Sequence, residues 1–336
     1  MTSDINRKPV RVAIDVMGGD YAPQEIVKGA IQAVEQDGTE LILVGSEDAI
    51  HKELEQYDVS GLPVRVVNAS EVVHDGESPV AALRQKPDAS VLVTMRLAKE
   101  GQADAVVSMG HTGAVMVSAM EILGKLEGIK RPSAGSFLGG FAPNTIVFDL
   151  GPNADCKPRD LVNFAVIGSV VARKLLHISN PTIALLSNGS EEGKGNKLAK
   201  ETYQLLKQSS INFIGNVEGN DILQGKANVI VCDGFTGNIL LKFCEGLGNS
   251  TIEWLRARLG KHLAQKEIDA IGNDLFALTH IADVNGGAMI YGIDGVVWVG
   301  HGRSKAPEVA EAIHQVNLAV EANFLGELKS ELGKLQ

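Results

Sequence analysis

Carboxylate and glycine residues follow an apolar run near the start of this chain. Val12–Ile14 leads into Asp15, and then into Gly18, Gly19 and Asp20. A buried strand does not normally carry a carboxylate, whereas the carboxyl end of a strand in an open α/β sheet often delivers one to a ligand site. The glycines permit a sharp turn and a close approach of the backbone to a ligand.

The same design recurs at five further positions. Apolar runs lead into polar turns at Met109–Gly113, Leu150–Asn153, Asn188–Asn196, Gly234–Asn238 and Gly300–Gly302. If one parallel sheet carries these runs, their turns line a single crevice. We therefore predict a binding set drawn from these turns: Asp15, Gly18, Gly19, Asp20, Thr112, Gly113, Gly195, Asn196, Asp233, Thr236 and Gly237.

Three of the turns suit a small anion such as phosphate. Thr112–Gly113, Gly195–Asn196 and Thr236–Asn238 stand where a helix should begin, and free backbone N–H groups attract anions there. Lys194 adds a mobile cation beside one of them. The alternative is that the threonine and asparagine side chains are plain N-caps. That alternative is favoured for any one turn, and the anion site is favoured for the set.

The carboxylates of these turns cannot all face a bound phosphate while ionised, because like charges repel. Most of them should instead accept backbone N–H bonds, pair with Lys194 or hold a substrate hydroxyl or amide. A metal bridge to phosphate is the rival solution. No tight ligand cluster supports it, so we expect no metal and no cofactor. His111 could donate a hydrogen bond to phosphate or to an oxyanion, or be a hydrogen-bonded turn residue, and His301 has the same two interpretations.

Composition excludes several classes of function. The 336 residues carry a formal net charge of -10 and only 4% aromatic residues, which disfavours broad binding to nucleic acid. The three cysteines have no metal-ligand spacing and read as reduced cytoplasmic thiols. No apolar run approaches the ~20 residues that span a bilayer. Neither a phosphate-loop, a dinucleotide nor a serine-elbow fingerprint is present.

Strand and helix patterns alternate along most of the chain, which predicts an α/β fold with a mostly parallel sheet and helices on both faces. We expect a disordered lead over residues 1–9 and a single α/β unit over residues 10–336. One region is helical without a strand and predicts a helical hairpin insertion, about 251–278. It is either a packed hairpin, on its own body or on a second subunit, or a carrier-protein or membrane surface. The residues of that surface would be Leu255, Leu259, Arg256, Arg258 and Lys261, in a face that also includes Ile252 and Leu263 and is flanked by Lys266.

Taken together, the motifs resemble the bacterial phosphate acyltransferases, the fatty acyl-[acyl-carrier-protein]:phosphate acyltransferases. The resemblance begins with V-A-I-D-V-M-G-G-D-Y-A-P and covers nearly the whole chain in order. It continues through Gly110–Ala114, Leu126–Pro132, Asp149–Asp155, Glu191–Asn196, Ile214–Glu218, Asp233–Asn238 and Gly286–Ala288. The chain departs from the family at His111, where Asn is usual, and at Pro152, where Ala is usual.

The resemblance implies transfer of a long-chain acyl group from acyl-[acyl-carrier-protein] to inorganic phosphate. The acyl phosphate would then serve a downstream glycerol-3-phosphate acyltransferase of phospholipid synthesis. It also implies a fold similar to phosphotransacetylases and isocitrate/isopropylmalate dehydrogenases, a homodimer, and a cytoplasmic protein peripheral to the inner face of the cytoplasmic membrane. Lys194, His111 and Asn238 become the expected catalytic residues, and Asn216 and Gly287 join the binding set. The alternatives are a short-chain phosphotransacetylase that uses acyl-CoA and a non-catalytic scaffold for a carrier protein or membrane.

Overall fold

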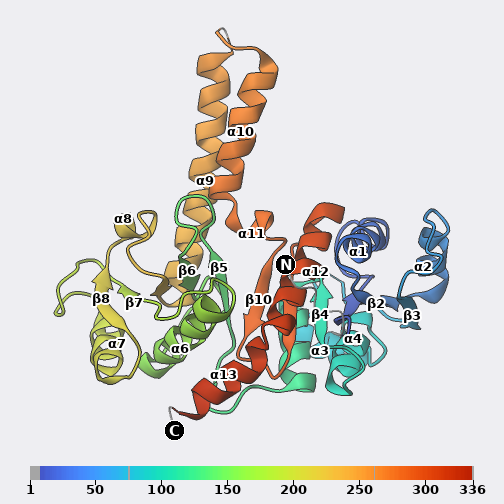
Figure 1. The fold of residues 1–336 in the computed structure, drawn as a ribbon, viewed down its shortest axis with the longest axis horizontal. Helices are drawn as coiled ribbons and strands as arrows, with labels where there is room; N and C mark the ends of the chain where they lie inside the picture. Colours follow the sequence, from blue (N-terminus) through green and yellow to red (C-terminus); the bar gives the residue numbers. More distant parts are fainter. Residues whose placement is uncertain (1–7, 75, 261, 335–336) are drawn as a thin grey trace, which may run out of the picture. The chain divides into compact units, whose positions relative to one another are not determined.

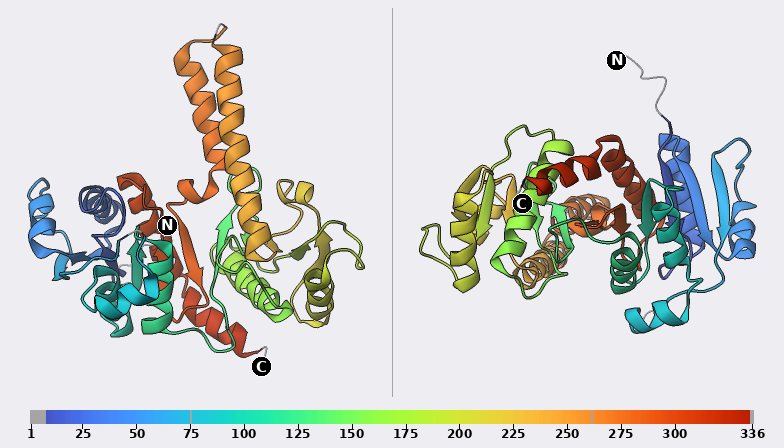
Figure 2. Two further views of the ribbon diagram at one scale, coloured as in Figure 1. Left: turned by 180° about the vertical axis from the view of Figure 1, so that it is seen from behind. Right: turned by 90° about the horizontal axis from the view of Figure 1, so that it is seen from below.

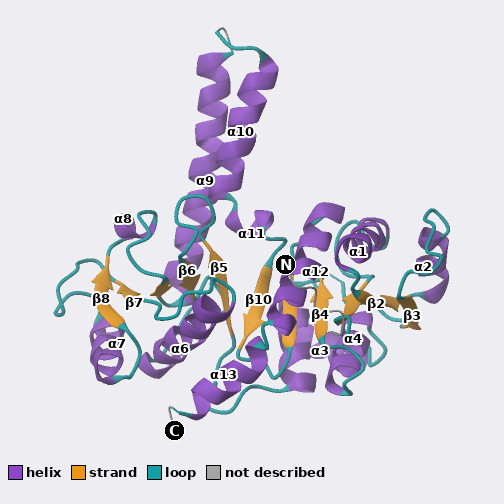
Figure 3. Ribbon diagram, in the orientation of Figure 1, coloured by secondary structure: helices purple, strands orange, loops and turns teal. Residues whose placement is uncertain are grey.

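The computed structural model describes residues 8–74, 76–260 and 262–334, which form two compact units. Unit 1 comprises Met1–Leu126 and Asn285–Gly326, and unit 2 comprises Glu127–Val284 and Glu327–Gln336. In each unit, strands are flanked by helices, as predicted (Figure 1, Figure 3). The single unit expected over residues 10–336 stays a prediction, because two compact units can still unfold together. The lead expected over residues 1–9 lies outside the described residues, apart from residues 8 and 9.

Unit 1 is built on strands in the spatial order β3-β2-β1-β4-β11-β10. All neighbours are parallel except β10 and β11. The strands are β1 (Arg11–Asp15), β2 (Glu40–Gly45), β3 (Val64–Asn68), β4 (Ala105–Ser108), β10 (Ala288–Tyr291) and β11 (Val296–Val299). The central strands are apolar on both faces, which is the pattern of a strand covered by helices on both sides.

The helices of unit 1 cover these strands. Ala13 and Ile42 pack in one cluster with Val93 and Leu97 of α4, whereas α12 packs on α1 and also contacts β1, β4 and β11. The helices are α1 (Gln24–Asp37), α2 (Glu47–Leu54), α3 (Pro79–Gln85), α4 (Ser90–Lys99), α5 (Thr112–Ser118) with the π-helical turn η1 (Ala119–Leu123), and α12 (Ala306–Glu321). A last helix, α13 (Phe324–Gly333), crosses the boundary between the units in sequence.

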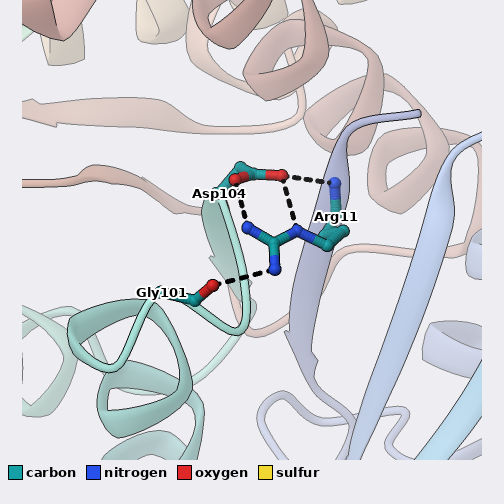
Figure 4. Close-up of polar contacts among 3 residues, drawn as sticks. All are labelled: Arg11, Gly101 and Asp104. Atoms are coloured by element: carbon teal, nitrogen blue, oxygen red, sulfur yellow. Dashed lines mark hydrogen bonds and ion pairs between the residues drawn. The ribbon is translucent and has the colours of Figure 1, made fainter. Parts of the chain in front are cut away.

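The amino end of β1 is tied to the turn before β4 (Figure 4). Arg11 donates from Nε and Nη2 to the two carboxylate oxygens of Asp104, at 3.0 and 2.7 Å, and from Nη1 to the carbonyl of Gly101 at 2.8 Å. A two-point guanidinium–carboxylate pair has a fixed geometry. It therefore helps to hold β1 and β4 in the register that places Asp15 beside Ser108 at their other ends.

Unit 2 has strands in the spatial order β5-β6-β9-β7-β8, of which only β5 runs antiparallel to its neighbour among the described residues. The strands are β5 (Ser133–Phe137), β6 (Ile146–Phe148), β7 (Ile183–Leu186), β8 (Phe213–Val217) and β9 (Val229–Val231). The helices are α6 (Pro158–Lys174), α7 (Lys197–Gln208), α8 (Gly219–Ile222), α9 (Gly234–Leu259), α10 (Gln265–Thr279) and α11 (Ile281–Val284).

Alternating residues of β6 and β9 meet helices on opposite faces. Phe148 and Val229 pack at Gly168 of α6. Val147 and Ile230 belong to a different cluster, against which Leu240 of α9 packs. Because successive side chains of a strand point to opposite faces, α6 and the foot of α9 cover the two sides of these strands.

The helical hairpin predicted from the sequence is present and is longer than expected. Its arms are α9, of 26 residues, and α10, of 15 residues, which lie side by side and extend away from the strands of unit 2 (Figure 1, Figure 2). Ile252 is buried in the seam between the arms, where it faces Gly272, and Leu255 and Leu259 are half-buried. These apolar residues of the predicted surface therefore also serve the packing of the hairpin.

A second apolar face of α9 is exposed. Phe235, Ile239, Phe243, Leu247 and Trp254 lie at helical spacing, and Phe243 and Trp254 are 64% and 62% exposed. We call these five residues the outer stripe. A row of exposed aromatic and aliphatic side chains is typical of a binding surface.

Candidate functional site

Asp15 lies at the carboxyl end of β1, directly beside Ser108 of β4. The Ser108 hydroxyl donates to Oδ2 of Asp15 at 2.7 Å. Burial raises the pKa of Asp15 above its usual value, although hydrogen bonds from Ser90 and Ser108 oppose the rise. A Cβ on Gly18 would come within 2.7 Å of both this carboxylate and the Gly110 amide nitrogen. Asp15 and Gly18 thus build the turn that carries the neighbouring site residues.

A polar pocket of about 350 Å³ lies at this edge of unit 1. It brings together the predicted residues Gly19, Asp20, His111 and Thr112. His301, which the sequence left open, also lines it, and so does His74, which the sequence analysis missed. Only the folded chain brings His74 here, since no strand-to-turn pattern precedes it. Three imidazoles and one carboxylate therefore share a pocket that can donate hydrogen bonds to an anion.

His111 is the N-cap of α5, so the alternative interpretation of Thr112 as a plain cap is wrong. Its Nδ1 accepts a hydrogen bond from the Ala114 amide at 3.3 Å. In a neutral imidazole, a nitrogen that accepts leaves the proton on the other nitrogen. The exposed His111 side chain therefore presents Nε2–H as a donor, with Gly113 packed beside its ring.

A second pocket, of about 450 Å³, lies within unit 2 at the carboxyl ends of β7 and β9, and leucine and alanine side chains share its lining with polar groups. We call it the polar pocket of unit 2 after the polar groups at its helix starts. The predicted residues Gly195, Asn196, Asp233 and Thr236 line it, together with Ser187, Asn188 and the first residues of α7. The sequence analysis expected the groups of the two units to share one crevice. That stays a prediction, and each pocket is complete within its own unit.

Two helices begin at this second pocket. Asn196 caps α7, as the sequence suggested, with Oδ1 accepting from the Ala199 amide at 2.8 Å. At α9 the cap is Asp233 rather than Thr236, because Oδ1 accepts the Thr236 amide and Oδ2 accepts the Thr236 hydroxyl, both at 2.9 Å. The start of α7 thus has a neutral cap, whereas the start of α9 has an ionisable one. An anion is favoured at α7.

Lys194 precedes the start of α7 by three residues. Its aliphatic stem passes over Gly189, and its side chain is exposed. Within the described residues, its ammonium has no ion pair. Glu192, a partner that the sequence allowed, pairs instead with Lys207 at 2.9 Å and with Gln204. Lys194 is therefore a cation whose charge is not neutralised within the described chain.

Several predicted residues hold loops instead of lining a pocket. Asn216 is buried and donates from Nδ2 to the Glu191 carbonyl at 2.9 Å, which fixes the turn that carries Lys194. Gly237 packs against the Asp149 carbonyl. Asn238 is exposed beside Gly151 and lines neither pocket, and its catalytic role stays a prediction. In unit 1, Gly287 is buried against the Val299 carbonyl.

Asp149 shows the loop-orienting role that was predicted for most carboxylates. It accepts from the amides of Ala134 and Asn153 at 3.1 and 2.9 Å, and from Nδ2 of Asn153 at 2.6 Å. Burial raises its pKa to about 6, although these hydrogen bonds oppose the rise. The Asp149 carboxyl is buried and its hydrogen bonds stay within unit 2, so it organises the Gly151–Asn153 turn.

The cysteines are poorly suited to nucleophilic catalysis. Burial raises the pKa of Cys156 to about 12 and the pKa of Cys232 well above its usual value, and it also raises the pKa of Cys244. The thiolate is the reactive form of cysteine. None of the three thiols is therefore prepared to accept an acyl group.

The described residues offer neither a cluster of metal ligands nor a membrane-spanning helix. Within residues 8–74, 76–260 and 262–334, no group of three or more His, Cys, Asp or Glu side chains could hold a metal ion. Over the same part of the chain, every helix is too short or too polar to cross a membrane.

The chain is similar to known proteins over nearly its whole length. The model of a family described as "Fatty acid synthesis protein" matches residues 10–326. A phosphate acyltransferase from Thermosynechococcus vestitus is 42% identical over 322 residues, covering 93% of this chain and 92% of the relative. Phosphate acyltransferases from Desulforudis audaxviator and Syntrophomonas wolfei are 41% and 43% identical, each covering 97% of this chain and 97% and 99% of the relative.

Solved structures show the same fold at low sequence identity. The EutD phosphotransacetylase from Staphylococcus aureus superposes with a TM-score of 0.62 at 17% identity and covers 94% of both chains. A phosphotransacetylase from Streptococcus pyogenes gives a TM-score of 0.60, also at 17% identity and 94% coverage of both. These likenesses confirm the predicted fold, a mostly parallel α/β architecture of the phosphotransacetylase kind.

Proposed function

This chain belongs to the fatty acid synthesis protein family that includes the phosphate acyltransferases, and from that membership we propose that it transfers a long-chain acyl group from acyl-[acyl-carrier-protein] to inorganic phosphate. The observation that carries the proposal is identity above 40% to phosphate acyltransferases over nearly the whole chain. The product would be an acyl phosphate, a reactive mixed anhydride suited to a downstream acylation of glycerol 3-phosphate.

The chemistry fits direct attack by phosphate on the thioester. One phosphate oxygen forms a bond to the carbonyl carbon, and the carbonyl oxygen takes the negative charge of the tetrahedral intermediate. The carbon–sulfur bond then breaks, and the thiol of the carrier leaves as a thiolate, whose conjugate acid has a pKa near ~8.5. No protein nucleophile is needed, which is consistent with the raised pKa of every cysteine.

We assign the phosphate to the pocket of unit 2. The start of α7 provides backbone N–H groups, and its cap Asn196, which lines the pocket, is neutral. Lys194 is not among the lining residues, but it lies three residues before α7 and supplies a positive charge there. These groups favour a dianion and would position it for attack. His111 lies in the pocket of unit 1, where its cap geometry leaves the Nε2–H donor available, and it stays a predicted catalytic residue through that donor.

The proposal is tested by incubating the pure protein with palmitoyl-carrier protein and phosphate, and trapping acyl phosphate with hydroxylamine. We expect phosphate-dependent hydroxamate formation with one free thiol released per hydroxamate. Treatment with EDTA should leave the rate unchanged. Thioester cleavage without phosphate would identify a thioesterase, and the absence of any cleavage would leave a scaffold. Activity with acetyl-CoA that exceeds activity with palmitoyl-carrier protein would favour the short-chain phosphotransacetylase.

The hairpin supports the assembly and membrane parts of the proposal. We propose that Phe235, Ile239 and Trp254 of the outer stripe join two copies of the chain in a homodimer, since exposed apolar side chains are costly in water. We propose further that the basic end of α9, with Arg256 and Arg258, meets the acidic carrier protein or an anionic membrane surface peripherally. Lys261, the third basic residue of the predicted surface, lies outside the described residues.

A further inference from the structure

An apolar cavity of about 190 Å³ lies in unit 2, at the foot of the hairpin. Its walls come from β5 and β6, from α8, from the second to fourth turns of α9, from the end of α10 and from α11. Leu138, Phe141, Ile222, Leu223, Leu240 and Leu247 are among the apolar residues of its lining. The cavity is separate from the polar pocket described above, with which it shares no lining residue.

The lining of this cavity fixes the chemistry of what it can hold. Ser136, Cys244 and Thr279 are the polar side chains of its lining, and the Thr279 hydroxyl already donates to the Leu275 carbonyl at 2.7 Å. A charged or strongly polar ligand would lose its hydration there without compensation. An apolar cavity of about 150 Å³ binds benzene. A space of about 190 Å³ therefore suits a hydrocarbon of roughly six to eight carbons.

One helix face connects this cavity with the polar pocket of unit 2. Thr236 lines the polar pocket, and Leu240, Phe243 and Leu247 line the apolar cavity. The spacing of these residues, i, i+4, i+7 and i+11, places them on the same side of α9. With a rise of 1.5 Å per residue, Thr236 and Leu247 are separated by about 16 Å along the axis. This separation matches a ligand with a polar head and a long apolar tail.

We propose that this cavity binds the distal methylenes of the acyl chain, while the thioester end lies at the polar pocket of the same unit. The inference rests on the proposed function and adds to it the site that selects chain length. Each methylene moved from water into an apolar site strengthens binding by roughly fourfold. An acyl chain that reaches the cavity gains this binding, whereas a four-carbon chain ends before Leu240.

The first test fills the cavity. Cys244→Trp enlarges a half-buried side chain of α9, and Leu223→Trp enlarges a side chain that approaches from the end of α8. Asn249→Trp is the matched control, because Asn249 is exposed on α9 and does not line the cavity. We measure kcat/KM for acyl-carrier proteins with 4 to 16 carbons at saturating phosphate, and thermal melting reports whether each variant folds.

We expect each cavity variant to lose roughly tenfold or more in kcat/KM with palmitoyl-carrier protein and less than twofold with butyryl-carrier protein. The control should keep the wild-type profile. A folded cavity variant with the wild-type chain-length profile overturns the inference and leaves the proposed function intact. Wild-type protein that is inactive on every thioester contradicts the proposed function itself. An equal loss at every chain length, together with a split dimer, would make the cavity a seat for the second copy and would also overturn the inference.

The second test does not use activity. Palmitate is added as a probe, and N-ethylmaleimide labelling of Cys244 is followed by peptide mass spectrometry. We expect palmitate to slow the labelling of Cys244 by at least fivefold and butyrate to leave it unchanged. Cys156, which does not line the cavity, is the internal control and should label at the same rate throughout. Labelling of Cys244 that palmitate does not slow would overturn the inference.

Discussion

Single residues at the helix starts decide what the two polar pockets can do. The sequence correctly placed polar turns at the carboxyl ends of strands, since apolar runs and glycines mark those positions. The alternative interpretation of three residues as plain N-caps is confirmed for Asn196 and is wrong for Thr112 and Thr236, because His111 and Asp233 cap those helices. Cap identity depends on where helical backbone angles begin, and composition does not fix that to one residue. His74 was missed because the polar residues that it joins in the pocket, Asp20, His111 and His301, are distant in sequence.

The cap geometry predicts how His111 can be replaced. In His111→Asn, Oδ1 can accept the Ala114 amide while Nδ2 takes over the donor role of Nε2. We expect kcat/KM to stay within about fivefold of wild type. His111→Ala loses both roles and should fall by roughly 10²-fold. A folded but inactive His111→Asn variant would instead indicate proton transfer by the imidazole.

Lys194 should contribute through its charge. Lys194→Ala removes the cation beside the start of α7, and we expect kcat/KM to fall by roughly 10²-fold. Lys194→Arg keeps the charge and should recover part of the loss. Lys207→Ala is the control, because that lysine pairs with Glu192. Steady-state kinetics with varied phosphate decide the matter, and a Lys194→Ala variant with wild-type kcat/KM would make Lys194 an ordinary surface lysine.

Asp149 predicts a pH dependence of stability. Burial raises the pKa of the Asp149 carboxyl from 3.8 to about 6 in the folded protein. Between these two pH values, the carboxyl is therefore protonated in the folded state and ionised in the unfolded chain. The contribution of Asp149 to the free energy of unfolding is therefore present below pH 4 and falls as the pH rises to about 6, by up to about 3 kcal/mol. Urea unfolding between pH 4 and 7 should show this fall in wild type and a smaller fall in Asp149→Asn, because burial also raises the pKa of Asp15.

The pKa of Asp104 is shifted in the opposite direction from that of Asp149, so its effect on stability has the opposite pH dependence. Partial burial raises its pKa, but the hydrogen bonds from Arg11 outweigh that effect and hold the pKa below its usual value. Its contribution is therefore present above pH ~3.9 and is lost as the pH falls below that value. Asp104→Asn should leave the slope between pH 4 and 6 unchanged. An unchanged slope in Asp149→Asn as well would remove Asp149 as its source.

At the scale of elements, the sequence predicts the strands and the helical hairpin. It does not predict which face of α9 is buried against α10 and which face stays exposed. The apolar face predicted from Ile252, Leu255 and Leu259 lies partly in the seam with α10. The outer stripe was missed because a helix with apolar residues on two faces has a weak single-face periodicity. Which face of α9 stays exposed depends on the side against which α10 packs, and that packing is a tertiary contact.

The basic end of α9 predicts an effect on the carrier protein. Arg256 lies 3.5 Å from Asp269 in an exposed pair, which contributes little to stability, so reversing its charge should leave the hairpin folded. We expect Arg256→Glu with Arg258→Glu to raise the KM for acyl-carrier protein several-fold at low salt, while the phosphate KM stays unchanged. Lys28→Glu with Lys52→Glu, on α1 and α2, makes the same change in net charge and should have no such effect. If the hairpin variant keeps its carrier KM and vesicle binding but loses its dimer, this end of α9 is an assembly surface.

At the scale of the whole molecule, the spatial order of the strands in unit 1 could not be predicted from the sequence. β11, from residues 296–299, lies between β4 and β10, and α12 packs on α1. These contacts join segments that are far apart in sequence, with all of unit 2 up to Val284 between them. Local sequence patterns predict strands and helices, but they do not predict which strands are neighbours in the sheet.

This order predicts the behaviour of fragments. A fragment of residues 1–126 lacks β11 beside β4 and α12 against α1, and we expect it to have no cooperative thermal transition by circular dichroism. Joining residues 1–126 to residues 285–326 by a flexible linker of roughly ten residues should restore a cooperative transition. Such a linker is long enough, because Leu126 lies beside Gly292 and ten residues reach about 33 Å. A cooperative transition in the short fragment would show that β11 and α12 are dispensable for folding.

The late arrival of β11 also affects how the chain is made. At 5 to 20 residues per second, a ribosome needs roughly 10 to 35 s to go from Leu126 to Val299. For that time, the edge of β4 that will receive β11 stays unpaired, and an unpaired strand edge invites association with other chains. Unit 2 needs only the end of α13 from the segment made later, so most of it can fold before unit 1 is complete. Unit 2, in the middle of the nascent chain, can thus fold before unit 1, which contains the amino-terminal strands. These strands are the part that most needs protection by chaperones during translation.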